Sequence, residues 1–277
     1  MILEPTTISL TDSHVMAIVN VTPDSFYAQS RCGDVEGLSR RIEESAAEDA
    51  TIVDIGGYSS RPGAAQVSME EEWARVRMGL RAVQSLDRGV VVSIDTFRAE
   101  VVRRAVAEFG EVIVNDISAG ELDEDMLNVV AKYELPYIAM HMRGTPQTMQ
   151  SQTDYEGGVV QGVVEYFRRR VVELQDAGIA RDRIILDPGF GFAKSASQNF
   201  ELMRALPTLR ELGFPLLVGV SRKSMIYRTL GITPEESLPS SLALAWEALR
   251  SGEAILRVHD VAATKQVLRL AQIYNKI

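Results

Sequence analysis

The sequence predicts an α/β protein of the (β/α)8 class, a TIM barrel formed as a single domain over residues 1–277. Eight short apolar, β-branched runs alternate with longer segments of helical periodicity. The runs recur with a mean spacing in the mid-thirties, and a barrel of eight such units typically needs about 250 residues. A doubly wound open sheet is the alternative, but it rarely contains eight units of such regular spacing.

The expected strands follow one another evenly along the chain. They are VMAIVNV (15–21), TIVDIGG (51–57), VVVSIDT (90–96), VIVNDIS (112–118), LPYIAMHM (135–142), RIILDPG (183–189), PLLVGVS (215–221) and AILRVHD (254–260). Helical patterns between them include residues 70–86, 163–178 and 237–252. Because the apolar runs are nearly continuous, we expect parallel strands that are covered on both faces.

Composition excludes several classes of protein. A net charge of -9 argues against binding nucleic acid or an anionic membrane through bulk charge. The single cysteine, Cys32, cannot form an intrachain disulfide, and the first ten residues lack the pattern of a signal peptide, so we expect a cytoplasmic protein. Three histidines and one cysteine make a zinc site improbable, and no Walker loop or GxGxxG motif is present.

Polar or glycine residues close every expected strand. They are Asn20, Gly56-Gly57, Asp95, Asn115-Asp116, His141, Asp187, Ser221 to Lys223, and Arg257 with His259. The carboxyl ends of barrel strands converge on one rim, where enzymes of this fold carry their active sites. A single Asp or Asn in such a position is more often a turn or helix cap, but the whole set indicates an active site.

The chemistry of these residues falls into three groups. Asp95, Asn115 and Asp187 can accept hydrogen bonds from a flat heterocycle that presents adjacent N–H donors, such as a 2-amino-4-oxo pyrimidine ring. Another group, Arg61, Arg257 and His259, is of the anion-binding type. Asn20 offers one neutral oxygen, which suits a Mg²⁺ ion that takes its other ligands from water and substrate phosphates.

Eight motifs resemble, in order, those of the dihydropteroate synthase family. They are NVTPDSF (20–26), DIGGYSSRPGA (54–64), SIDT (93–96), NDISAG (115–120), MHMRGTPQTMQ (140–150), DPGFGFAK (187–194), SRKS (221–224) and RVHDV (257–261). The resemblance extends from about residue 15 to residue 270. It implies a barrel enzyme that joins 6-hydroxymethyl-7,8-dihydropterin diphosphate to p-aminobenzoate, giving dihydropteroate and diphosphate.

The resemblance also implies a role for particular residues. The pterin pocket would comprise Asp95, Asn115, Asp187 and Lys223. The diphosphate would be bound by Arg257 and His259, and by Asn20 through a Mg²⁺ ion. The p-aminobenzoate site would comprise Ser60, Arg61, Pro62, Phe192, Lys223 and Ser224. Lys223, Asp187, Arg257 and His259 would act in catalysis, mainly by positioning and electrostatics. Members of the family are commonly dimers, so a homodimer is expected, with the helical region 236–275 as one candidate surface.

Two loops depart from the family pattern. After NVTPDSF the family continues Ser-Asp-Gly-Gly, whereas this chain has Tyr27-Ala28-Gln29-Ser30, and the usual Glu-Ser-Thr is Tyr58-Ser59-Ser60. These changes leave open a non-catalytic pterin-binding paralogue. A methyltetrahydrofolate-binding methyltransferase is a further alternative, but it needs no diphosphate site. Arg222 has no role that the sequence assigns.

Overall fold

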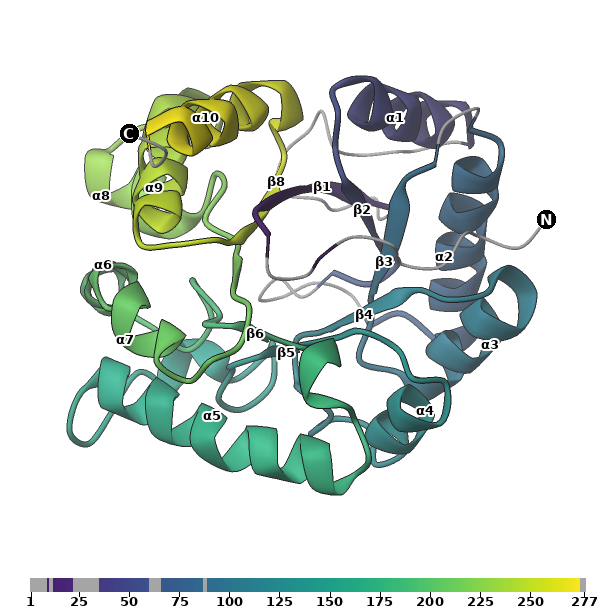
Figure 1. Ribbon diagram of the computed structural model, residues 1–277, viewed down its shortest axis with the longest axis horizontal. Coiled ribbons are helices and arrows are strands. Elements are labelled where there is room, and N and C mark those ends of the chain that lie inside the picture. The colour runs from purple at the N-terminus through teal and green to yellow at the C-terminus, as the bar shows by residue number, and fades with distance from the viewer. Residues whose placement is uncertain (1–8, 10–11, 22–34, 60–65, 87–88, 275–277) are drawn as a thin grey trace.

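The computed structural model describes residues 9, 12–21, 35–59, 66–86 and 89–274. Eight parallel strands surround a common centre, and helices cover them on the outside (Figure 1). The strands are β1 (His14–Asn20), β2 (Ile52–Gly56), β3 (Val91–Asp95), β4 (Ile113–Asp116), β5 (Tyr137–Met140), β6 (Ile184–Asp187), β7 (Leu217–Val218) and β8 (Ile255–Val258). Seven of the eight expected runs contain one of them, and β1 begins one residue before its expected run, so the predicted TIM barrel is confirmed.

Strand pairing runs in the order β6-β5-β4-β3-β2-β1-β8-β7. A parallel bridge between Leu186 and Leu216 joins the two ends of this series and nearly closes the barrel. β7 is much shorter than the expected run 215–221. The chain already turns beyond it, where the amide of Lys223 donates to the carbonyl of Val220 at 3.2 Å.

The helices are α1 (Val35–Ala47), α2 (Met69–Gln84), α3 (Ala99–Phe109), α4 (Met126–Lys132), α5 (Val159–Asp176), α6 (Ala196–Arg204), α7 (Leu206–Arg210), α8 (Ser224–Leu230), α9 (Leu238–Arg250) and α10 (Val261–Tyr274). Helices α2, α5 and α9 overlap the three helical patterns that the sequence indicates. Ser68 caps α2 by accepting the amide of Glu71 at 3.2 Å. Ser195 and Gln198 form a capping box at the start of α6, which satisfies amides that have no partner inside the helix.

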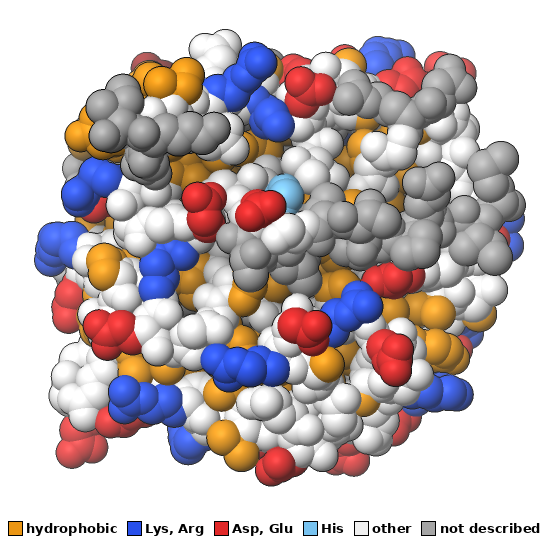
Figure 2. Space-filling model, viewed as in Figure 1, with side chains coloured by type: hydrophobic (Ala, Val, Ile, Leu, Met, Phe, Trp, Pro, Cys, Tyr) orange, Lys and Arg blue, Asp and Glu red, His pale blue; other side chains and the backbone are white. Residues whose placement is uncertain are grey.

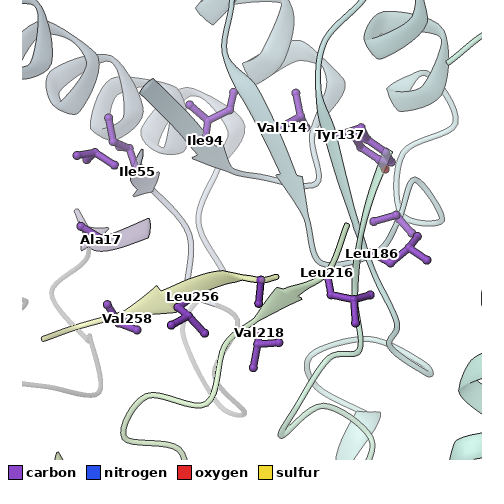
Figure 3. Packing of buried hydrophobic residues seen from close by; sticks show 14 of the residues in the cluster. Ala17, Ile55, Ile94, Val114, Tyr137, Leu186, Leu216, Val218, Leu256 and Val258 are labelled. Carbon is purple, nitrogen blue, oxygen red and sulfur yellow. The ribbon is translucent and has the colours of Figure 1, made fainter. Parts of the chain in front are cut away.

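Alternation along the strands separates two apolar layers. One set of side chains, including Ala17, Ile55 and Leu256, packs between the barrel and the helices (Figure 3). The opposite set faces the barrel interior near the start of the strands and comprises Met16, Ile52, Ile113, Ile138, Ile185, Leu217 and Ile255. This interior layer fills the amino-terminal end of the barrel, so only the carboxyl end is left for polar side chains.

Charged side chains of both signs lie on the surface of the protein (Figure 2). Lys and Arg side chains are interspersed with Asp and Glu around the face shown in Figure 2. Within the described ranges, no helix has the length and the apolar character to cross a bilayer.

Candidate active site

Polar side chains replace the apolar layer in the upper half of the barrel. Asp54, Asp95, Asn115, Asp187 and Arg257 have the inward parity of their strands and come from β2, β3, β4, β6 and β8. Strand register pairs Asp95 with Asn115. The structure therefore brings together the pterin-pocket residues that the sequence predicts, and it adds Asp54.

Arg257 lies at the centre of this cluster. Its Nε donates to Asp54 Oδ2 at 2.6 Å, and its Nη2 donates to Asp95 Oδ2 at 2.7 Å. Burial opposes the charged guanidinium, but attraction by Asp54 and Asp95 prevails and raises the pKa of Arg257. The sequence suggested an anion-binding arginine, and in the structure two carboxylates bind it.

Asp54 is the main site residue that the sequence analysis missed. Its side chain is fully buried and also accepts a hydrogen bond from Asn115 Nδ2 at 3.0 Å. The residues expected at the rim lie at the ends of strands, whereas Asp54 lies in the middle of one. A usable signal was present, because a carboxylate among apolar residues in a buried strand requires a polar partner.

Two further carboxylates line the same mouth. Burial raises the pKa of Asp95 to about 7; the Arg257 charge opposes this rise, and the nearby carboxylates, Asp54 first, add to it. Asp187 accepts the amide of Gly189 at 2.8 Å through Oδ1. Burial likewise raises the pKa of Asp187, against the attraction of the Lys223 ammonium.

Asp95, Asn115 and Asp187 each have one polar atom held by the protein and one oxygen left over. The held atoms are Asp95 Oδ2, Asn115 Nδ2 and Asp187 Oδ1. Within the described ranges, no hydrogen bond reaches the second oxygen of any of the three. The barrel mouth thus offers three acceptor oxygens to a ligand that is rich in N–H groups.

Lys223 supplies the positive charge beside these acceptors. Its Nζ donates to the carbonyl of Phe190 and lies 5.0 Å from the centre of the Phe192 ring. Burial lowers the pKa of Lys223 to about 8; Asp187 opposes this and Arg257 reinforces it. Lys223 is the N-cap residue of α8. Ser224, which the sequence predicts to be in the p-aminobenzoate site, is the first residue of that helix.

A second lysine, Lys194, is buried behind the loop that carries Phe190 and Phe192. Its Nζ contacts His141 Nδ1 at 3.0 Å, the carbonyl of Gly189 at 3.0 Å and that of Phe192 at 2.9 Å. Burial lowers the pKa of Lys194 to about 7, and Asp187 opposes the shift. The sequence placed His141 on the rim; instead its ring packs outside the barrel, 4.8 Å from that of Tyr166 on α5.

Asp116 is a second residue that the sequence placed on the rim. It has the outward parity of β4 and accepts hydrogen bonds from the Tyr137 hydroxyl at 2.8 Å and from the amides of Ser118 and Gly120 at 2.7 and 2.8 Å. This carboxylate stabilises a turn and takes no part in the mouth of the barrel. Side-chain alternation explains why Asn115 and Asp116, adjacent in sequence, have different roles.

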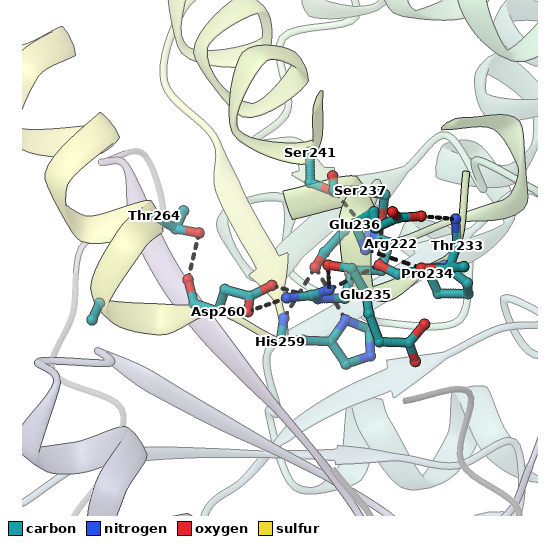
Figure 4. A network of polar contacts seen from close by, with 12 residues as sticks. Arg222, Thr233, Pro234, Glu235, Glu236, Ser237, Ser241, His259, Asp260 and Thr264 are labelled. Carbon is teal, nitrogen blue, oxygen red and sulfur yellow. Dashed lines mark hydrogen bonds and ion pairs between the residues drawn. The ribbon is translucent and has the colours of Figure 1, made fainter. Parts of the chain in front are cut away.

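Arg222 has a structural role, which the sequence could not assign. Its guanidinium donates to both oxygens of Asp260 at 2.8 Å and to the carbonyls of Pro234 and Glu235 at 2.8 Å (Figure 4). The side chain is buried, and the backbone has a φ of 53°. Arg222 therefore connects the segment before α8 to the residues that follow β8 and to the segment that precedes α9.

His259 lies next to this network. Its Nδ1 is 3.1 Å from Ser221 Oγ, and its carbonyl accepts a hydrogen bond from Arg41 Nη2 at 2.6 Å. Burial and the cations around it, Arg257 first, lower the pKa of His259 to about 3. The ring is therefore neutral at pH 7 and can offer an anion a hydrogen bond but no charge.

The loops that close the expected arylamine site are described only in part. Ser60, Arg61, Pro62 and Ala28 lie outside the described residues. Tyr58, the unusual residue of the second loop, packs edge-on against Phe97 with ring centres 5.1 Å apart. The Arg98 guanidinium lies 5.6 Å from the centre of the Tyr58 ring. Tyr58 thus joins an aromatic contact between the loops after β2 and β3.

Comparison with known proteins agrees with this geometry. Residues 16–259 match the family of pterin binding enzymes, and the chain belongs to that family. Within it, the similar curated proteins are dihydropteroate synthases. That of Synechocystis is 44% identical over 94% of this chain and 89% of its own, and that of Escherichia coli K12 is 40% identical over 96% and 93%.

Solved structures of the same enzyme superpose closely on this chain. The Yersinia pestis dihydropteroate synthase with a sulfonamide drug has a TM-score of 0.92 and 35% identity, and the match covers 100% of both chains. The Xanthomonas albilineans enzyme with 4-aminobenzoic acid has a TM-score of 0.86 and 39% identity over 97% of this chain and 95% of its own. The same enzyme in complex with 7,8-dihydropteroate has a TM-score of 0.83 and 35% identity, covering 98% and 96%.

Proposed function

We propose that this chain is a dihydropteroate synthase. It would condense 6-hydroxymethyl-7,8-dihydropterin diphosphate with p-aminobenzoate to give 7,8-dihydropteroate and diphosphate, a step of folate biosynthesis. The observation that carries the proposal is the set of three acceptor oxygens beside Lys223 at the barrel mouth. The related enzymes, one solved with 4-aminobenzoic acid and with 7,8-dihydropteroate, support it. Residues 1–277 would form one pterin-binding domain.

The pterin ring matches the acceptor set. A 2-amino-4-oxo pyrimidine presents N–H donors side by side, which Asp95, Asn115 and Asp187 can accept in a water-poor pocket. Lys223 can donate to the oxygen or nitrogen acceptors of the same ring and remains mostly protonated at pH 7, because its pKa is about 8. These contacts orient the ring so that its exocyclic methylene points toward the second substrate.

Asn20, Arg257 and His259 would hold the diphosphate. Asn20 ends β1, and its Oδ1 lies 3.3 Å from the point where a Cβ on Gly56 would be, so glycine keeps this oxygen accessible. Among the described residues, no group of three His, Cys, Asp or Glu could hold a metal. One neutral oxygen beside a diphosphate fits Mg²⁺, which retains waters and phosphate ligands. When bound there, Mg²⁺ would neutralise charge on the leaving diphosphate.

The reaction breaks the bond between the methylene carbon and the diphosphate oxygen and forms a carbon–nitrogen bond to the arylamine. An arylamine is neutral at pH 7, so no strong general base is required, and its proton leaves after attack. Phe192, Ser224 and the residues Ser60 to Pro62 would bind p-aminobenzoate. Lys223, Asp187, Arg257 and His259 would act by positioning and by stabilising the charge that develops.

Diphosphate release from the pterin diphosphate tests the proposal. Release should require both p-aminobenzoate and Mg²⁺, and Asn115→Ala or Lys223→Ala should reduce kcat/KM by about 10²-fold or more. Asp116→Asn serves as a control, because its carboxylate is buried next to Asn115 in sequence but faces away from the pocket. Binding of the pterin diphosphate without turnover would identify a non-catalytic paralogue instead.

We further propose a cytoplasmic homodimer. In solution, the mass at micromolar concentration should be about twice 30.6 kDa. A monomeric mass would contradict this part of the proposal.

A further inference from the structure

Asp54 contacts two of the residues that face the substrate, and the family resemblance assigns it no role. It lies in the middle of β2 with its side chain fully buried. One oxygen, Oδ2, accepts both Arg257 Nε at 2.6 Å and Asn115 Nδ2 at 3.0 Å. A single carboxylate oxygen therefore connects the middle of β2 to β4 and β8.

This contact determines which way the Asn115 amide points. A carboxylate has no hydrogen to donate, so only the NH₂ side of an amide can face it. Asn115 Nδ2 is thereby directed at Asp54, and Asn115 Oδ1 is directed away from it. Without such a partner, the two orientations of an amide are nearly equivalent in shape and can interchange.

We propose that Asp54 is a positioning residue that sets substrate specificity by locking Asn115 with its oxygen toward the ligand. The inference rests on the proposed function, since it concerns recognition of the pterin ring. With the amide in this orientation, each of Asp95, Asn115 and Asp187 presents an acceptor oxygen to the ligand. If the amide flipped, an NH₂ group would face the N–H donors of the ring, and the pocket would reject them.

The charge of Asp54 has a second effect through Arg257. Because Asp54 and Asp95 share that guanidinium, Asp95 keeps one oxygen bound to Arg257 and its other oxygen available to a ligand. The second oxygen of Asp54, Oδ1, is buried and has no hydrogen-bond partner among the described residues. Asp54 therefore positions both Arg257 and Asn115 through the single oxygen Oδ2.

A double-mutant cycle on ligand binding tests the role of Asp54. The probe is 6-hydroxymethylpterin, which lacks the diphosphate, and its Kd is measured by isothermal titration calorimetry. Asp54→Ala and Asn115→Ala should each weaken binding about 30-fold, within the range for one hydrogen bond to a charged group. The double variant should weaken binding only about 100-fold, because Asp54 acts through Asn115.

Asp54→Asn provides the conservative rescue. Arg257 Nε needs an acceptor, so the side-chain oxygen of the new asparagine will face it. The same oxygen then accepts a hydrogen bond from Asn115 Nδ2, which preserves the orientation of the Asn115 amide. Ring binding should stay within about 5-fold of wild type. If Asp54→Ala does not fold, Asp54→Leu, which resembles aspartate in branching but accepts no hydrogen bond, replaces it in the cycle.

Asp116→Ala is the matched control for a merely structural effect. Asp116 is as buried as Asp54 but faces outward, so its loss should lower the melting temperature and leave the Kd of the pterin unchanged. If the double variant binds about 900-fold more weakly than wild type, the two single effects simply multiply, and the inference is wrong. An Asp54→Asn variant that binds as weakly as Asp54→Ala would also overturn it. A wild-type protein that does not bind the pterin would instead overturn the proposed function itself.

Discussion

Replacing Lys194 by methionine should destabilise the protein. It should also weaken substrate binding, although Lys194 is not one of the residues expected to contact substrate. Methionine is an unbranched side chain one atom shorter than lysine, and it cannot donate a hydrogen bond. In the structure Lys194 is 5% exposed, and its ammonium has three partners: His141 Nδ1 and the carbonyls of Gly189 and Phe192. The loop that it braces carries the carbonyl of Phe190 that binds Lys223.

The magnitude follows from these contacts. Each buried acceptor left without a donor costs about 1–3 kcal/mol, so three of them would cost several kcal/mol. The variant no longer buries an ammonium group, which offsets part of that cost. We expect the free energy of unfolding to fall by about 2–4 kcal/mol at pH 7. The KM for the pterin diphosphate should rise about 10-fold, because Lys223 and Asp187 adjoin the loosened loop.

The cost of this substitution should depend on pH. Burial lowers the folded-state pKa of Lys194 to about 7, below its ordinary value of 10.5. Between these values the unfolded chain binds one more proton than the folded chain, so this group makes the wild type more stable as pH rises above 7. The methionine variant lacks that contribution, and the difference between the two proteins should widen by up to about 1.4 kcal/mol per pH unit.

Urea unfolding at pH 7 and pH 8.5, followed by circular dichroism, measures both quantities. The slope with urea concentration should be the same for the two proteins, so that the midpoints report stability. Lys132→Met on the end of α4 serves as the control, because Lys132 contacts the ring of a neighbour, Tyr133, on the outside of the barrel. A Lys194→Met cost below about 1 kcal/mol, or a cost that narrows from pH 7 to pH 8.5, would refute the reasoning.

Two further predictions concern the pH profile and the backbone. The kcat/KM for the pterin diphosphate should rise with pH through about 7, because Asp95 ionises there. It should fall above about 8, because Lys223 then loses its proton. A kcat/KM that stays constant from pH 6 to 9 would contradict these assignments. Gly189→Ala should cost more than about 4 kcal/mol in unfolding free energy, because its Cβ would lie 2.0 Å from the carbonyl oxygen of His141 at a φ of +68°. Gly231→Ala, at a φ of +67° with nothing within 4 Å, should cost only about 1 kcal/mol; equal melting temperatures for the two variants would exclude a steric cause.

The fold could be predicted from sequence because its signals are local. Apolar runs, helical periodicity and regular spacing report which residues each segment buries, and each expected run overlaps a strand. The same reasoning located Asp95, Asn115, Asp187 and Lys223, since the carboxyl ends of parallel strands meet at one rim. Errors arose where residues at strand ends were treated alike. Asp116 and His141 face outward, and one-residue alternation would have separated Asn115 from Asp116.

The partners of these side chains could not be predicted, because they depend on closure of the barrel. Arg257 is 203 residues from Asp54 and 162 residues from Asp95 in sequence. No local pattern specifies such a pair; it forms because β8 returns beside β1 and all inward side chains of the upper half share one small volume. Sharing that volume directs the Asn115 amide and holds Arg257 between two carboxylates. It also shifts the pKa values of Asp95 and Lys223 by burying charges that a single strand would leave in water.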